Sequence, residues 1–124
     1  MNRATYAVPA LLMLALAAPA FAQDAAKVDA KHYKVEFENA KVRVLRASYG
    51  PHEKSVMHSH PDAVAVFLSD GQVKFTFPDG KTQDAPIKAG TTMWTPATTH
   101  LPENVGDKPF EVLVIELKGK PAKK

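Results

Sequence analysis

Three histidines, His58, His60 and His100, are the residues of this chain whose types and spacing could do chemistry. His58 and His60 are one residue apart, so on an extended strand their side chains point to the same face. A third imidazole from a distant strand would complete a set of nitrogen ligands that suits a divalent transition metal ion. Iron, zinc, manganese, nickel and copper all accept imidazole. The alternative is that all three histidines are surface residues, the first two in a turn before Pro61.

Such a set of ligands predicts a reactive site. Three neutral imidazoles leave a divalent ion with its full charge and with open coordination positions. That charge favours an anionic, chelating partner such as an enolate or a carboxylate. The chemistry indicated is dioxygen activation on a small chelating molecule, or Lewis-acid isomerisation or hydrolysis.

The first 22 residues predict a secretory signal peptide. They contain a basic start at Arg3, an apolar stretch over residues 10–18 and a small-x-small site ending at Ala22. Cleavage there would release residues 23–124 to the periplasm or the outside. An uncleaved anchor is the alternative, but the apolar stretch is short beside the roughly 20 residues of a membrane span. We therefore expect no membrane insertion after cleavage.

The basic excess of the chain lies at its end. The sequence has 16 Lys and Arg against 13 Asp and Glu, and four of the lysines fall within residues 118–124. A nucleic-acid site would spread basic residues over the folded surface. We expect instead a flexible basic tail and no nucleic-acid partner. The absence of cysteine excludes disulfides, thiolate ligands and a cysteine nucleophile.

The rest of the sequence predicts one all-β domain. Residues 23–32 are polar and alanine-rich, which indicates a linker or a frayed start, and a domain follows over 33–117. Turn signals at 69–71 and 78–80 predict hairpins. Short runs of β-forming residues at roughly 8–12 residue spacing are typical of a sandwich or barrel. The expected strands are 33–37, 42–47, 63–68, 73–77, 83–88, 91–96 and 110–117.

Two segments of this domain resemble the signature segments of the cupin family. Gly50, His58, His60 and Gly71 match the first, and Gly90, Pro96, His100 and Asn104 match the second. The resemblance extends over roughly 33–117 and implies a double-stranded β-helix, or jelly-roll barrel. It also implies that His58, His60 and His100 are the metal ligands.

The chain departs from the family pattern at one ligand. The glutamate expected four or five residues after His60 is replaced by Val64 and Ala65, neither of which can bind a metal. The glycine expected between Pro96 and His100 is also absent. The chain is thus similar to small bacterial cupins with three histidines, or to a binding cupin that has lost its metal.

Two functions are consistent with this resemblance. The first is an exported metal-dependent enzyme, of dioxygenase or isomerase type, acting on a small oxygenated molecule. The second is a non-enzymatic module that binds a small carboxylate or a sugar through hydroxyls near the site. The candidate pocket residues are Met57, Val64, Phe67, Trp94 and Asn104.

The strand expected over 33–37 suggests a homodimer. An open sheet edge tends to be covered, so this alternating segment could pair with a second chain. A molar mass of one chain by light scattering would refute this hypothesis.

Overall fold

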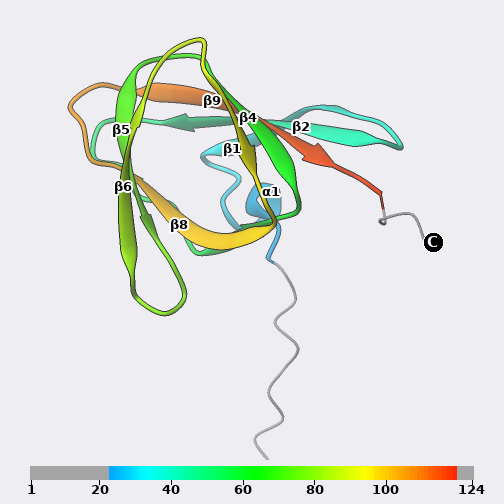
Figure 1. Ribbon diagram of the computed structural model, residues 1–124, viewed down its shortest axis with the longest axis horizontal. Coiled ribbons are helices and arrows are strands. Elements are labelled where there is room, and N and C mark those ends of the chain that lie inside the picture. Colours follow the sequence, from blue (N-terminus) through cyan, green and yellow to red (C-terminus); the bar gives the residue numbers. More distant parts are fainter. Residues whose placement is uncertain (1–22, 120–124) are drawn as a thin grey trace, which may run out of the picture.

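A computed structural model describes residues 23–119, which form two facing β-sheets and one short helix (Figure 1). The expected signal peptide and residues 120–124 lie outside the described part. The elements are α1 (Ala25–Val28), β1 (Tyr33–Glu38), β2 (Val42–Tyr49), β3 (His58–His60), β4 (Ala63–Phe67), β5 (Gly71–Thr76), β6 (Thr82–Ile87), β7 (Thr92–Thr95), β8 (Thr98–Asn104) and β9 (Phe110–Leu117). Within residues 23–119, no helix is long and apolar enough to cross a membrane.

The strands pair antiparallel in two sheets. One sheet has the order β1-β2-β9-β4-β7 and the other β3-β8-β5-β6. The apolar strand β9 lies in the middle of the five-stranded sheet, as its sequence predicts. The all-β jelly-roll architecture is therefore confirmed, and seven expected strands are present with bounds shifted by one or two residues.

Successive side chains of a strand point to opposite faces of the sheet. In the larger sheet this alternation decides which side chains face the barrel interior. Leu45 of β2 pairs with Val114 of β9, which pairs with Ala65 of β4, and all three face the core. Glu116 lies two residues after Val114 and therefore shares this inner face. Side chains of the opposite parity, such as Val64, lie on the outer face of the sheet.

One local expectation was wrong. The segment 69–71 is not a hairpin, because β4 and β5 belong to different sheets and the chain crosses between them there. The strand Thr98–Asn104, which contains His100, is not among the expected strands and forms despite its threonines and a proline. The turn at 78–80 does join a hairpin, β5 to β6, with Gly80 at a φ of 86° that favours glycine.

The segment 23–32 is folded against the barrel rather than frayed. Asp24 caps α1 by accepting a hydrogen bond from the Ala26 amide (3.0 Å), and the Gln23 carbonyl accepts one from the Ser59 amide of β3 (2.8 Å). Ala25 is fully buried. The composition of this segment predicted a linker. Composition does not reveal these contacts, because they are made with residues distant in the sequence.

Strand β1 is an open edge of the larger sheet within the described residues. Its apolar side chains Val35 and Phe37 are 49% and 53% exposed. The homodimer remains a prediction, and the open edge is compatible with it.

Candidate metal centre and cavity

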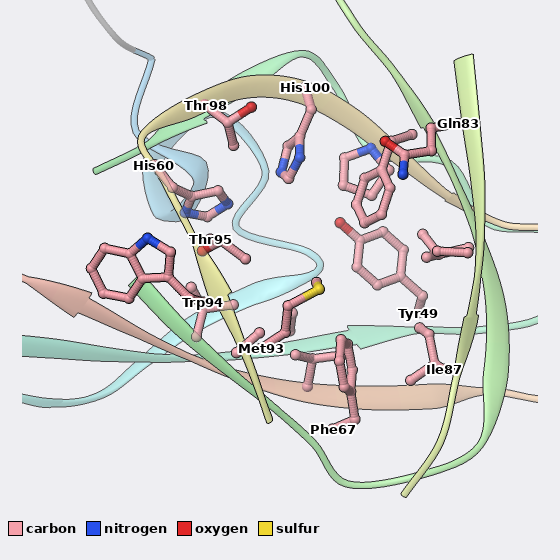
Figure 2. Close-up of a pocket in the computed structure, with 18 of the residues that line it drawn as sticks. Tyr49, His60, Phe67, Gln83, Ile87, Met93, Trp94, Thr95, Thr98 and His100 are labelled. Atoms are coloured by element: carbon pink, nitrogen blue, oxygen red, sulfur yellow. The ribbon is translucent and has the colours of Figure 1, made fainter. Parts of the chain in front are cut away.

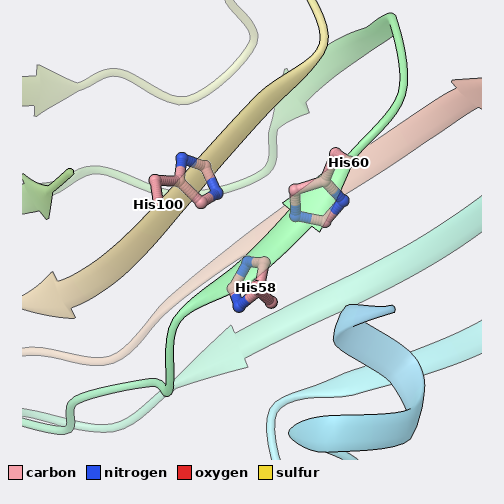
Figure 3. A group of neighbouring side chains, drawn as sticks. All are labelled: His58, His60 and His100. Carbon is pink, nitrogen blue, oxygen red and sulfur yellow. The ribbon is translucent and has the colours of Figure 1, made fainter. Parts of the chain in front are cut away.

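The pairing of β3 with β8 brings the three histidines together. His58 lies directly opposite His100, and His60 lies opposite Thr98. His58 and His60 share a face by alternation, and cross-strand partners share a face by register. The ring centroids are 4.8 Å apart for His58 and His60, 5.0 Å for His58 and His100, and 5.4 Å for His60 and His100. Figure 3 shows the three rings gathered between the two strands.

The free nitrogens of this cluster fit a metal ion. One candidate ligand atom from each ring lies within 4.8 Å of the other two. The Nε2 atoms of His58 and His100 are buried and have no hydrogen-bond partner within residues 23–119. An unpaired buried polar atom is costly, so two such atoms in one cluster indicate a missing partner. A metal ion bound by all three rings would satisfy them.

Hydrogen bonds assign the proton on two of the rings. His58 Nδ1 lies 2.8 Å from the Val56 carbonyl, which can only accept, so Nδ1 carries the hydrogen and Nε2 presents a lone pair. His60 Nδ1 donates to Glu116 Oε2 at 2.7 Å. A carboxylate on the far nitrogen of a ligating histidine orients the ring and raises its basicity.

Glu116 is the buried end of a chain of charges that continues through the partly exposed Arg43 and Asp24. Its Oε1 accepts from Arg43 Nε at 2.8 Å and Nη2 at 2.6 Å. Arg43 donates in turn to both carboxylate oxygens of Asp24, at 2.7 and 2.8 Å. Glu116 is 2% exposed, so its charge depends on these partners. The folded N-terminal segment thus supports the His60 ring through Arg43 and Glu116.

Burial keeps two of the histidines neutral. Burial, together with the smaller effect of the neighbouring His60, lowers the pKa of His58 to about 4 and that of His100 to about 3. Both rings are therefore unprotonated at pH 7, which is the form that binds a metal. The hydrogen bond to Arg43 lowers the pKa of Asp24, which keeps that carboxylate charged.

A cavity of about 400 Å³ opens beside the cluster inside the barrel (Figure 2). His60 and His100 are on its wall, and no Lys, Arg, Asp or Glu is among its lining residues within 23–119. Aromatic and aliphatic side chains dominate it. Figure 2 shows the Tyr49 hydroxyl pointing toward the side where His60 and His100 lie, with Phe67 and Ile87 on the opposite side.

Two of the five candidate pocket residues line the cavity, and three do not. Phe67 and Trp94 line the cavity. Met57, Val64 and Asn104 are not among the lining residues. Met57 is out of phase with His58 and His60, and Val64 faces outward because Pro61 and Asp62 separate β3 from β4 and the two strands enter different sheets.

Asn104 does not line the cavity but connects two loops to the barrel through hydrogen bonds. It is fully buried, and its amide nitrogen donates to the carbonyls of Lys108 at 2.8 Å and Gly50 at 3.0 Å. Its amide oxygen accepts from the Gly106 amide at 2.9 Å. These are structural contacts that fill the side chain's bonding capacity.

We expect Asn104→Ala to destabilise the protein without removing a metal ligand. Three partners would lose their hydrogen bonds in a buried site, which costs about 2–4 kcal/mol. Urea unfolding measures this loss, and elemental analysis of the folded variant should give the wild-type metal content. An unchanged free energy of unfolding would contradict the structural role.

Sequence reasoning did not assign roles to Asp24, Arg43, Glu116 or Tyr33. Glu116 carried a usable signal, since it is an acidic residue at an inward position of a mostly apolar strand. Arg43 carried none, because it meets Glu116 only through the sheet register, and Asp24 meets Arg43 only through the fold of the N-terminal segment.

Comparisons with known proteins agree with the geometry. A family model described as "Cupin domain" matches residues 45–116, more than half of the chain. A cupin domain from Bordetella pertussis Tohama I is 25% identical with a TM-score of 0.66, over 70% of this chain and 92% of that one. A protein with a double-stranded β-helix domain from Klebsiella pneumoniae is 22% identical, with a TM-score of 0.57, over 73% and 74% of the two chains. No curated protein matched the sequence.

Proposed function

This chain belongs to the cupin family, and from that premise we propose that it is an exported metalloprotein that binds one divalent transition metal ion through His58, His60 and His100. We further propose that it is an enzyme of dioxygenase or related type acting on a small, oxygen-bearing chelating molecule. The observation that carries the proposal is the pair of buried, unpaired Nε2 atoms of His58 and His100 beside His60. When bound, the ion would supply Lewis acidity and, if it is iron or copper, electrons for dioxygen chemistry.

The surrounding residues support this function by orienting the ligands. Glu116 holds the His60 ring, and the Val56 carbonyl holds the His58 ring, so that both present Nε2 to one point. The apolar barrel interior limits water around the site and strengthens electrostatic interactions there. Three neutral imidazoles retain the full charge of the ion for an incoming oxygen ligand.

The alternative of a non-enzymatic carboxylate or sugar module has less support. It rested on threonine hydroxyls near the site, but within residues 23–119 only two threonines, Thr95 and Thr98, line the cavity. The Thr95 hydroxyl already donates to the Ala63 carbonyl at 3.2 Å. The described part of the wall has no Lys or Arg to pair with a carboxylate, and most of it is apolar, which disfavours a sugar.

Metal content tests the proposed centre. We expect protein comprising residues 23–124, isolated after native export, to contain about one equivalent of one transition metal by elemental mass spectrometry. His58→Ala/His60→Ala and His100→Ala remove ligands and should each reduce the content to background. His52→Ala is the matched control, because His52 is exposed and contacts only Asp107 within the described residues.

The outcomes separate the two functions. Metal retained by His100→Ala at the wild-type level would overturn the three-histidine site. Wild-type protein that takes up no metal, even after reconstitution, would leave the binding module as the remaining candidate. N-terminal sequencing of the same exported protein tests the proposed cleavage, for which Gln23 should be the first residue.

A further inference from the structure

We propose that the ligand of this cavity has two parts: an uncharged, apolar body that fills the barrel, and one oxygen-bearing head that faces the histidines and accepts a hydrogen bond from Tyr33. This rests on the proposed function, since the head is the part that would reach the metal ion. The inference names a class of ligand and a residue that recognises it.

The body must be uncharged because the cavity offers nothing to pair with a charge. No Lys, Arg, Asp or Glu lines it within residues 23–119. The wall away from the histidines includes Phe67 and Ile87 (Figure 2), and Val73 and Phe110 also line the cavity. Transferring an ion into such surroundings without a partner is strongly unfavourable, and an unpaired hydroxyl is also costly. A compact ring or branched hydrocarbon fits instead.

Most of the polar groups of the wall lie toward the histidines. His60, His100 and Thr98 lie there, and the Tyr49 hydroxyl points to the same side, while Gln83 also lines the cavity (Figure 2). A molecule with its polar end toward the histidines therefore meets more hydrogen-bonding groups than one in the reverse orientation. The volume of about 400 Å³ is at the lower end of the range for small-molecule sites, which limits the ligand to a compact one.

Tyr33 is positioned to recognise the head. Its ring packs against His58 and His60, with centroid distances of 4.9 and 5.6 Å. Its oxygen accepts the hydroxyl hydrogen of Tyr49 at 2.7 Å. Its own hydroxyl hydrogen has no acceptor within the described residues, although the residue is only 4% exposed. A buried donor without an acceptor, on the cavity wall and beside the histidines, fits an oxygen of the ligand.

The protonated form of Tyr33 is the one that can donate. A tyrosine hydroxyl, whose ordinary pKa is about 10, keeps its hydrogen across the physiological range. Tyr49 supports this arrangement, because its hydrogen bond to the Tyr33 oxygen leaves the Tyr33 hydrogen available.

Two probes with the same head and different bodies test the ligand class. The zinc-loaded protein, which has no redox chemistry, is titrated by calorimetry with 4-methylcatechol and with 3,4-dihydroxybenzoate. We expect the methyl compound to bind at least about tenfold more tightly, because the carboxylate of 3,4-dihydroxybenzoate would be buried unpaired. Equal affinity, or preference for the carboxylate, would overturn the apolar body.

Two variants that each remove one hydroxyl group test the role of Tyr33. We expect Tyr33→Phe to weaken 4-methylcatechol binding about threefold to tenfold, the effect of losing one buried hydrogen bond. Ser59→Ala is the control and should change it less than about twofold, because the Ser59 hydroxyl bonds Thr99 on the face of β3 opposite the histidines. The melting temperatures of the free variants are recorded to separate loss of recognition from loss of folding. An effect of Tyr33→Phe no larger than that of Ser59→Ala would overturn the assignment.

A failure of the metal site would be distinguishable from a failure of this inference. Metal content is measured first and reports on the histidines alone. The metal-free protein is then titrated with 4-methylphenol and 4-hydroxybenzoate, which do not chelate. The apolar wall should still favour 4-methylphenol, and the absence of that preference would overturn the ligand class whether or not metal binds.

Discussion

Lowering the pH from 7 to 5 is expected to reduce the free energy of unfolding of the metal-free protein by about 2 kcal/mol for each of His58 and His100. Burial lowers the pKa of His58 from 6.5 to about 4 and that of His100 from 6.5 to about 3. Between these values and 6.5, the unfolded chain binds protons that the folded chain does not. Acid therefore favours unfolding in this window.

The sign of the effect follows from linkage. The contribution of each neutral histidine is fully present above pH 6.5 and is lost as the pH falls toward the folded pKa. The window from pH 6.5 to about 5 isolates the histidines, because the carboxylates of Asp24 and Glu53 have lowered pKa values and stay charged there. The Glu53 pKa is lowered to about 2 by hydrogen bonds from Lys31 and His32.

Urea unfolding of the chelator-treated protein at several pH values measures this dependence. His100→Gln removes one titrating ring and should make the dependence on pH shallower by about half. Saturation with zinc should raise the stability at pH 7 by mass action, and this gain should shrink as acid displaces the metal. A free energy of unfolding that stays constant between pH 7 and 5 would show that these rings do not remain neutral in the fold.

Glu116→Gln is expected to lower zinc affinity about 10- to 100-fold and to destabilise the metal-free protein by about 3–5 kcal/mol. The substitution removes the charge that receives the His60 Nδ1 hydrogen and that pairs with Arg43. Arg43 would then keep only its pair with Asp24, with its side chain 17% exposed. The loss of affinity comes from a less basic and less ordered His60 ring.

Glu111→Gln is the matched control, since it makes the same substitution on the same strand. The Glu111 side chain is 47% exposed and pairs with Arg46 at the surface, where an ion pair contributes about 1 kcal/mol or less. Competition with a chromophoric chelator measures zinc affinity, and urea unfolding measures stability. If Glu116→Gln held zinc as tightly as Glu111→Gln, the chain of charges would have no role in metal binding.

Local pattern predicted much of this fold because alternation is a property of neighbouring residues. The strand β9 was visible as an apolar run, and β5 and β6 were joined by a recognisable turn. The common face of His58 and His60 followed from their spacing. The cupin resemblance added His100, which sits opposite His58 although 42 residues of sequence separate them.

Features set by distant contacts were not predictable in this way. Strand β8 contains Pro102 and two threonines, so its strand character depends on pairing with β3 and β5. The helix α1 has only four residues and is held by Asp24 and by packing on β1 and β3. On a continuous strand Val64 would share a face with His60, but the chain changes sheets at Pro61 and Asp62 and Val64 faces outward.

The chain of charges from Asp24 to Glu116 also bears on the order of folding. It links residues near the start of the described chain to the last strand: Glu116 is 73 positions after Arg43 and 56 positions after His60. Contacts of such long sequence separation form slowly, because the intervening loop must close first. A chain that lacks β9 has all three histidines but no carboxylate to hold His60. High-affinity metal uptake would therefore report that the barrel has closed, and a rapid-mixing experiment could use it as a signal for the final folding step.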